Sequence, residues 1–291
     1  MQPVAVGACQ EFARFLSCEG FTTKAGHWLA LGINPGEVVD WNHQVRDGLV
    51  DKCLDQVHRV GGLCVAAHPH APYPSGDFMF PFRGFDVVEV WNGLWTSDRP
   101  WNADNEAALA EWGRSLAADI RTGSWRPAMG NSDTHLEGQI GIPHSVVFAE
   151  ELSTEAVLAG IRAGRSWIAE SADVDVSFTA NADGRVVGVG ERLATHGGQV
   201  EVQAAVRGVP VGTVSFHTDR GKGRLSLQTG RAWCNGTRRR STRRSFALRS
   251  AIPTGTSPHS PIRSSSTDRS LHREVRRRRR QMRLQASSSR P

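Results

Sequence analysis

The chain lacks the features that mark secreted or membrane proteins. Its five cysteines form no C-x-x-C pair and are odd in number, so neither a disulfide framework nor a zinc–thiolate knuckle is indicated. No apolar stretch is long enough to cross a bilayer. Residues 1–16 lack the basic start and long apolar core of a signal peptide. We therefore expect a cytoplasmic protein with reduced cysteines and no membrane partner.

Acidic residues are nearly absent from the last part of the chain. Residues 231–291 hold 17 arginines, no lysine, and only Asp268 and Glu274, which gives this segment a net charge of +15. The whole chain carries +6, so residues 1–230 carry −9. An acidic body argues against nucleic-acid binding by the folded part, so nucleic acid is a possible partner only through the basic tail.

Composition predicts that residues 229–291 form a disordered Arg/Ser-rich tail, because apolar periodicity is lost there. Three interpretations remain open. The tail is a flexible arm that binds nucleic acid, or a solvated segment without a partner, or the product of a shift out of the normal reading frame near residues 224–231. We favour the frame shift, because composition changes abruptly at that point and the preceding β pattern is cut short.

Strand and helix patterns alternate over the first 170 residues. Apolar runs at 63–67, 86–90, 127–130, 145–148 and 166–169 predict buried strands. Helical spacing is found at 49–60 and 103–120, and a further helix begins at Ser153, a good N-cap residue. This alternation predicts an α/β fold with a parallel sheet or barrel. Residues 171–228 instead alternate polar and apolar positions between glycine-rich turns, which predicts a small antiparallel β module.

Two short polar clusters follow predicted strands. His68 and His70 come directly after residues 63–67, and Asp133 and His135 come after residues 127–130. His27 lies in a further strand candidate at 26–33. Side chains at the ends of neighbouring strands can converge on one point. Imidazole and carboxylate groups there suit a divalent metal ion, and such an ion suits hydrolysis.

Other polar and aromatic residues lie at the same strand ends. Asn92 follows the strand at 86–90 and is a candidate to touch substrate or metal-bound water. Glu89 lies inside that strand, and a structural role is the stronger interpretation. Trp91 and Trp95 fit either ordinary packing or the wall of an apolar substrate pocket.

These motifs carry a resemblance to a known superfamily. The segments Ala67-His68-Pro69, Glu89-Val90-Trp91-Asn92-Gly93 and Ser132-Asp133-Thr134-His135 resemble the PHP (polymerase and histidinol phosphatase) superfamily, and most closely its CehA/McbA-type metallohydrolases. The resemblance implies a distorted βα barrel with a cluster of two or three metals. It implies hydrolysis of phosphoesters or of related esters and carbamates. His27, His68, Asp133 and His135 match metal-ligand positions of the family.

The chain also departs from the family pattern. The family begins with a His-x-His motif, and residues 1–26 contain no histidine, so the first barrel strands are expected to be missing. The family places a bridging glutamate directly before a segment like Phe21-Thr22-Thr23. Gly20 stands in that slot, and Glu19 is one residue away. A regular strand would turn Glu19 to the opposite face, whereas a β-bulge would bring it back.

The sequence thus predicts an incomplete, distorted PHP-type βα barrel at 1–170, a small antiparallel β module at 171–228 and a disordered basic tail at 229–291. We expect a metal-dependent hydrolase that holds Zn, Mn or Fe and uses metal-bound hydroxide on a small-molecule ester or phosphoester, with activity reduced by the missing ligands. The alternative is a non-catalytic pseudo-enzyme or a nucleic-acid binder.

Overall fold

A computed structural model describes the larger part of the first 249 residues. The described residues are 2–6, 18–23, 25–34, 49–71, 78–94, 101–120, 122, 125–135, 137–196, 199–209, 212–218, 221–227, 231–236 and 246–249. The chain divides into two units, residues 1–254 and residues 255–291. All residues of the second unit lie outside the described part.

The first unit contains a five-stranded sheet that carries most of the predicted site. Its strand order is β2(Cys18–Thr23), β3(Gly26–Leu31), β4(Leu63–Ala66), β5(Val87–Asn92), β6(Ala128–Asn131). Strands β4, β5 and β6 are parallel, whereas β3 runs antiparallel to both β2 and β4. The parallel sheet expected from the sequence is therefore confirmed for three strands. The sequence did not predict that β3 would run antiparallel to β4.

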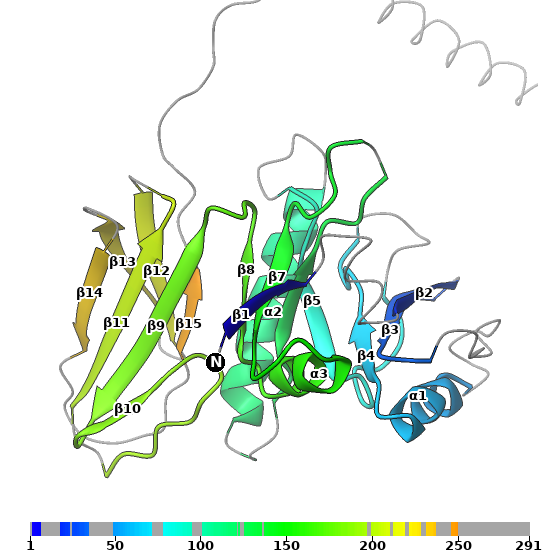
Figure 1. Cartoon of the computed structure of the whole chain (residues 1–291), viewed down its shortest axis with the longest axis horizontal. Coiled ribbons are helices and arrows are strands. Elements are labelled where there is room, and N and C mark those ends of the chain that lie inside the picture. Colours follow the sequence, from blue (N-terminus) through cyan, green and yellow to red (C-terminus); the bar gives the residue numbers. More distant parts are fainter. Residues whose placement is uncertain are drawn as a thin grey trace, which may run out of the picture. The chain divides into compact units, whose positions relative to one another are not determined.

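Three helices are present in the described residues, and each packs beside one strand (Figure 1). Helix α1(Val50–Arg59) lies on β4, α2(Trp101–Asp119) on β5, and α3(Thr154–Arg162) on β7(His144–Ala149). The predicted N-cap is confirmed, because the Ser153 hydroxyl accepts a hydrogen bond from the Ala156 N–H. No described helix combines the length and apolarity needed to cross a membrane.

The two faces of the five-stranded sheet bury separate apolar clusters. One face packs against α1 around Trp28 and Leu54. The other packs against α3 and β7 around Val65, Val147 and Val157. A strand such as β4 is fully buried on both faces, which explains its uninterrupted apolar sequence.

Strand β7 belongs to a second sheet of order β1–β7–β8, where β1 is Gln2–Val6 and β8 is Ser166–Ala169. Both neighbours run antiparallel to β7. Strands β6 and β7 contact each other without joining one sheet. The described chain is a mixed α/β structure with several sheets, and the barrel detail of the expectation is not confirmed.

The later strands form two antiparallel sheets. One has the order β10(Arg185–Val187), β9(Asp175–Ala182), β11(Val200–Arg207), β14(Arg231–Gly236), and the other the order β13(Gly221–Leu227), β12(Gly212–Thr218), β15(Phe246–Arg249). The antiparallel strand pairing predicted from the alternating pattern is thus observed. Strands β14 and β15 lie within the segment where composition predicted disorder, and they differ from that expectation because they pair with β11 and β12. The rest of 229–291 lies outside the described residues.

Candidate metal centre at the ends of β4, β5 and β6

His27 and His68 meet at one edge of the sheet. Because β3 runs antiparallel to β4, the start of β3 lies beside the end of β4, and the Ala67 N–H donates to the His27 carbonyl. The His27 Nδ1 atom is 3.0 Å from the His68 Nε2 atom. The two rings meet edge to face, with centroids 4.7 Å apart. The structure therefore brings together two imidazoles that are 41 residues apart.

Glu89 connects the ends of three parallel strands. Its carboxylate accepts the His68 backbone N–H at 2.6 Å, the Asn92 side-chain amide at 3.3 Å and the Asn131 side-chain amide at 2.7 Å. The side chain is buried, with 2% of its surface exposed. The register of β5 against β6 shifts between Glu89 and Trp91, and such a bulge re-aims the strand at this point.

The start of α2 fixes the same strand ends from outside. The Asn105 side chain accepts the Asn92 N–H at 2.8 Å and donates to the Asn92 carbonyl at 3.1 Å. The Asp104 carboxylate accepts the His70 N–H at 2.9 Å. Both residues are buried, so β4 and β5 are held in position by polar groups that water does not reach.

Asp133 and His135 lie in the segment that follows β6. The His135 Nδ1 atom donates to the Asp133 carbonyl at 2.7 Å and lies 3.8 Å from its carboxylate Oδ1 atom. The Asp133 side chain is 39% exposed and that of His135 is 73% exposed. His68 and Asp133 both have positive φ angles, 25° and 44°. Left-handed backbone at residues other than glycine stores strain, and such strain is concentrated at functional sites.

The charges of these groups influence one another. Burial lowers the pKa of His27 and neighbouring His68 lowers it further, while the Asp133 carboxylate opposes both effects. Burial raises the pKa of Glu89 to about 7, against the opposing influence of His68 and of its hydrogen bonds. A lowered pKa favours the neutral form of the His27 ring, and a neutral imidazole is the form that binds metal ions.

The predicted ligands are thus gathered only in part. His27 and His68 are in contact, Asp133 is close enough to act on His27 and Glu89, and His135 contacts Asp133. Within the described residues, a group of three ligand atoms that lie within 4.8 Å of one another occurs elsewhere, at His58, Cys64 and Asp86. A third ligand at the His27–His68 pair requires the Asp133 segment to move closer.

The remaining predicted site residues are Glu19, Trp91 and Trp95. In the regular register of β2, Glu19 pairs with Ala30 and Thr22 pairs with His27. Three residues, or about 10 Å along a strand, therefore separate Glu19 from the His27 position, and the pairing of β2 with β3 contains no bulge that shortens this distance. Trp91 lies in β5, half-buried. Trp95 and the side chain of Glu19 lie outside the described residues.

Asn92 is buried and held by hydrogen bonds from both its side chain and its backbone. Its side chain is 8% exposed and donates to Glu89, while its backbone is bonded to Asn105. In this arrangement Asn92 supports the Glu89 carboxylate. Asn105 and Asn131 could not be recognised from the sequence, because no local pattern links an amide side chain to a partner that is distant in the chain. The signal for Glu89 was present, since a lone acid inside an apolar strand requires buried partners.

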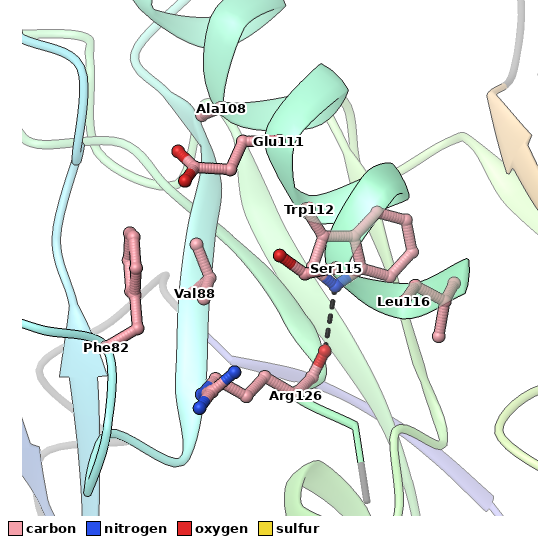
Figure 2. A pocket seen from close by; sticks show the side chains of 8 residues that line it. All are labelled: Phe82, Val88, Ala108, Glu111, Trp112, Ser115, Leu116 and Arg126. Carbon is pink, nitrogen blue, oxygen red and sulfur yellow. Dashed lines mark hydrogen bonds between the residues drawn. The ribbon is translucent and has the colours of Figure 1, made fainter. Parts of the chain in front are cut away.

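A small cavity lies between α2 and β5, apart from these strand ends (Figure 2). Its volume is about 20 Å³, enough for a single water molecule and too small for a substrate. The Trp112 indole N–H donates to the Arg126 carbonyl at 2.8 Å across it. Glu111, which lines this cavity, also contacts His70 at 2.5 Å and so ties α2 to the segment after β4.

Comparisons with known proteins give little further identification. No protein-family model matches the chain. No curated protein is significantly similar to it. A solved structure that resembles it is a two-domain protein from Bacteroides vulgatus containing a predicted PHP-like metal-dependent phosphoesterase. The likeness covers 84% of this chain and 70% of that one, with 13% sequence identity and a TM-score of 0.42.

Proposed function

We propose that the chain is a metal-dependent hydrolase of the PHP type, of the CehA/McbA branch, acting on a phosphoester or a related ester or carbamate. The observation that carries the proposal is the contact of His27 with His68 at the ends of β3 and β4, with the Asp133 segment beside it. The motifs quoted from the sequence stand at these strand ends.

The donor set suits a divalent cation. Two imidazole nitrogens 3.0 Å apart are near the separation of about 3.3 Å that two nitrogen ligands take in a tetrahedral site with bonds of about 2.0 Å. His27, His68, Asp133 and His135 would hold the ion. Imidazole and carboxylate ligands are compatible with Zn, Mn or Fe. Such an ion would lower the pKa of water and polarise the substrate oxygen.

The other residues of the site hold these donors in place. Glu89 accepts the His68 N–H and thereby fixes the backbone that presents the imidazole. Asn131 donates to the same carboxylate and so links it to the segment that leads to Asp133. Asn92 donates a further hydrogen bond to the Glu89 carboxylate, and Asn105 accepts the Asn92 N–H and so holds the Asn92 backbone in place. In this assignment Asn92 and Glu89 are positioning residues.

The proposal is tested with the full chain freed of metal by a chelator. Zn, Mn or Fe is added back, and hydrolysis of p-nitrophenyl phosphate, an aryl ester and an aryl carbamate is followed. Metal-dependent turnover that is lost in both His68→Ala and Asp133→Ala supports the proposal. Turnover that is independent of metal, or unchanged in both variants, overturns it.

A second candidate is a non-catalytic nucleic-acid binder. The observation that favours it is the net charge of +15 on residues 231–291. Binding through arginine–phosphate contacts weakens steeply with salt. Salt-dependent DNA binding by the full chain that disappears when residues 255–291 are deleted, with no hydrolysis under any metal, would favour this candidate.

A further inference from the structure

A cluster of side chains of the types that can bind metal ions lies at the opposite end of the parallel strands. His58 is in the last turn of α1, Cys64 is in β4, and Asp86 directly precedes β5. One ligand atom from each residue lies within 4.8 Å of the other two. Cys64 and His68 are four residues apart along β4 and the residues after it, or about 13 Å. The cluster is therefore separate from the candidate centre described above.

The chain brings these three residues together by a tight return from α1 into β4. The Gly62 N–H donates to the Val57 carbonyl at 3.0 Å and the Gly61 N–H to the His58 carbonyl at 3.0 Å. A Cβ atom at Gly62 would lie 2.7 Å from the Leu31 carbonyl oxygen and 2.7 Å from Val57 Cγ1. Only glycine allows this close approach, which sets the end of α1 over the start of β4.

Asp86 is held firmly in the cluster. Its Oδ2 atom accepts the Cys64 N–H at 2.7 Å and the His58 Nε2–H at 2.8 Å. The carboxylate is thus anchored by the backbone of the same residue that supplies the sulfur. About a third of the His58 side chain and a quarter of the Asp86 side chain are exposed, so an ion has access from solvent.

The donor types match one class of ion. A nitrogen, a sulfur and a carboxylate oxygen are the ligands that Zn²⁺ accepts, with bonds of about 2.0 Å to nitrogen and oxygen and about 2.3 Å to sulfur. Tetrahedral ligands at these distances lie about 3.3–3.6 Å from one another, which small side-chain movements reach from the observed separations. A thiolate and a carboxylate would also balance the charge of a divalent cation.

We infer that His58, Cys64 and Asp86 form a binding site for a thiol-preferring divalent cation such as Zn²⁺, which pins the end of α1 to the starts of β4 and β5. Three protein ligands leave the fourth position to water. Burial and the nearby Asp86 charge raise the pKa of the Cys64 thiol, so binding replaces the thiol proton, which passes to solvent. The ion acts here as a structural pin, independent of the proposed hydrolysis.

The test is a titration of the chelator-treated full chain with Co²⁺, which substitutes for zinc and gives a near-ultraviolet charge-transfer band when a thiolate binds it. Cys53 provides the matched control, because it is also buried in the same apolar cluster and is not among the three ligands. The band is expected in the wild-type chain and in Cys53→Ala. It is expected to vanish in Cys64→Ala and to weaken at least tenfold in apparent affinity in His58→Ala.

Thermal melting provides a second measurement that does not depend on a thiolate band. Zn²⁺ is expected to raise the Tm of His58→Ala less than the Tm of the wild type and of Cys53→Ala, because a ligand that binds only the folded state stabilises it and His58→Ala retains only the candidate centre at His27 and His68. No charge-transfer band at saturating Co²⁺, or a band that persists in Cys64→Ala, overturns the inference. His68→Ala separates the two sites, since it should abolish hydrolysis and leave the cobalt–thiolate band intact.

Discussion

The Nδ1 atom of His27 lies 3.0 Å from the Nε2 atom of His68, although 41 residues separate them in the chain. The contact exists because β3 runs antiparallel to β4, so that the first residues of one strand meet the last residues of the other. Two ring nitrogens at this distance share either a proton or a cation. Burial and the nearby His68 lower the pKa of His27, which disfavours a second positive charge and favours the cation-binding form.

Replacement of His68 tests this pair directly. In His68→Ala the backbone N–H that Glu89 accepts is retained, so the strand end keeps its position while the imidazole is lost. We expect metal-dependent hydrolysis to fall by more than the roughly 10- to 100-fold loss seen when only an outer partner of a ligand is removed. Metal titration with activity as the readout checks this.

The exposed His196 gives the matched control for that experiment. His196→Ala should keep both metal affinity and turnover, because its side chain is exposed and it is not one of the candidate metal ligands. An equal loss of activity in both variants would indicate that the imidazole at residue 68 has no special role.

Much of the fold was predictable because buried parallel strands and amphipathic helices have local patterns. The apolar run at 63–67 became β4, and the helical spacing at 49–60 became α1. The direction of β3 was not predictable in this way, because the residues of one strand do not encode whether its neighbour runs parallel or antiparallel. The strand β14 was missed for a related reason, since its pairing with β11 outweighs a composition typical of disorder.

The candidate site likewise combines residues that the sequence reveals with contacts that it does not. His68, Asp133 and His135 were noticed because they follow apolar runs, and His27 because it lies in a strand candidate, but the closeness of His27 to His68 depends on tertiary structure. The sequence favoured a structural role for Glu89. Its hydrogen bonds to His68, Asn92 and Asn131 show what that role is, because they join the ends of three strands. Those partners lie on three different strand ends, so no spacing in the sequence could reveal them.

The buried Glu89 carboxyl predicts a specific pH dependence of stability. Its pKa rises from 4.5 to about 7 on folding, so the folded state binds a proton more tightly than the unfolded state. The stability that this protonation contributes is fully present below about pH 4.5 and is lost as the pH rises through 7. Glu89→Gln cannot titrate, so the wild type should lose stability relative to this variant between about pH 5 and pH 8.

Denaturant unfolding of the metal-free proteins at several pH values measures this difference. The titration of His27 has the opposite sign, because its lowered pKa reduces stability as the pH falls below 6.5, but it is present in both proteins. The comparison therefore isolates Glu89. Stability curves that run parallel over the whole range would show that Glu89 does not change its charge on folding.

The core around Trp28 predicts a large loss of stability on truncation. Its side chain has no exposed surface, stacks on Phe21 with ring centroids 4.2 Å apart and meets Phe85 edge to face. Trp28→Ala should lower the free energy of unfolding by about 3–5 kcal/mol, because it leaves a cavity between the sheet and α1. Val186→Ala, at a side chain that is 64% exposed, should change it by no more than about 0.5 kcal/mol.

The Asn105 side chain predicts how strongly α2 fixes the end of β5. It satisfies both the N–H and the carbonyl of Asn92 while being only 1% exposed. Asn105→Leu keeps similar volume but leaves two buried backbone groups without these bonds, at a cost of about 1–3 kcal/mol for each group. Because Asn92 donates to Glu89, the loss should also disturb the His68 backbone and reduce turnover.

Asn105→Asp is the comparison variant. It retains the bond to the Asn92 N–H and should lose less stability than Asn105→Leu, and denaturant unfolding of the two variants ranks them. The opposite ranking, with the leucine variant as stable as the wild type, would mean that β5 holds its end without α2.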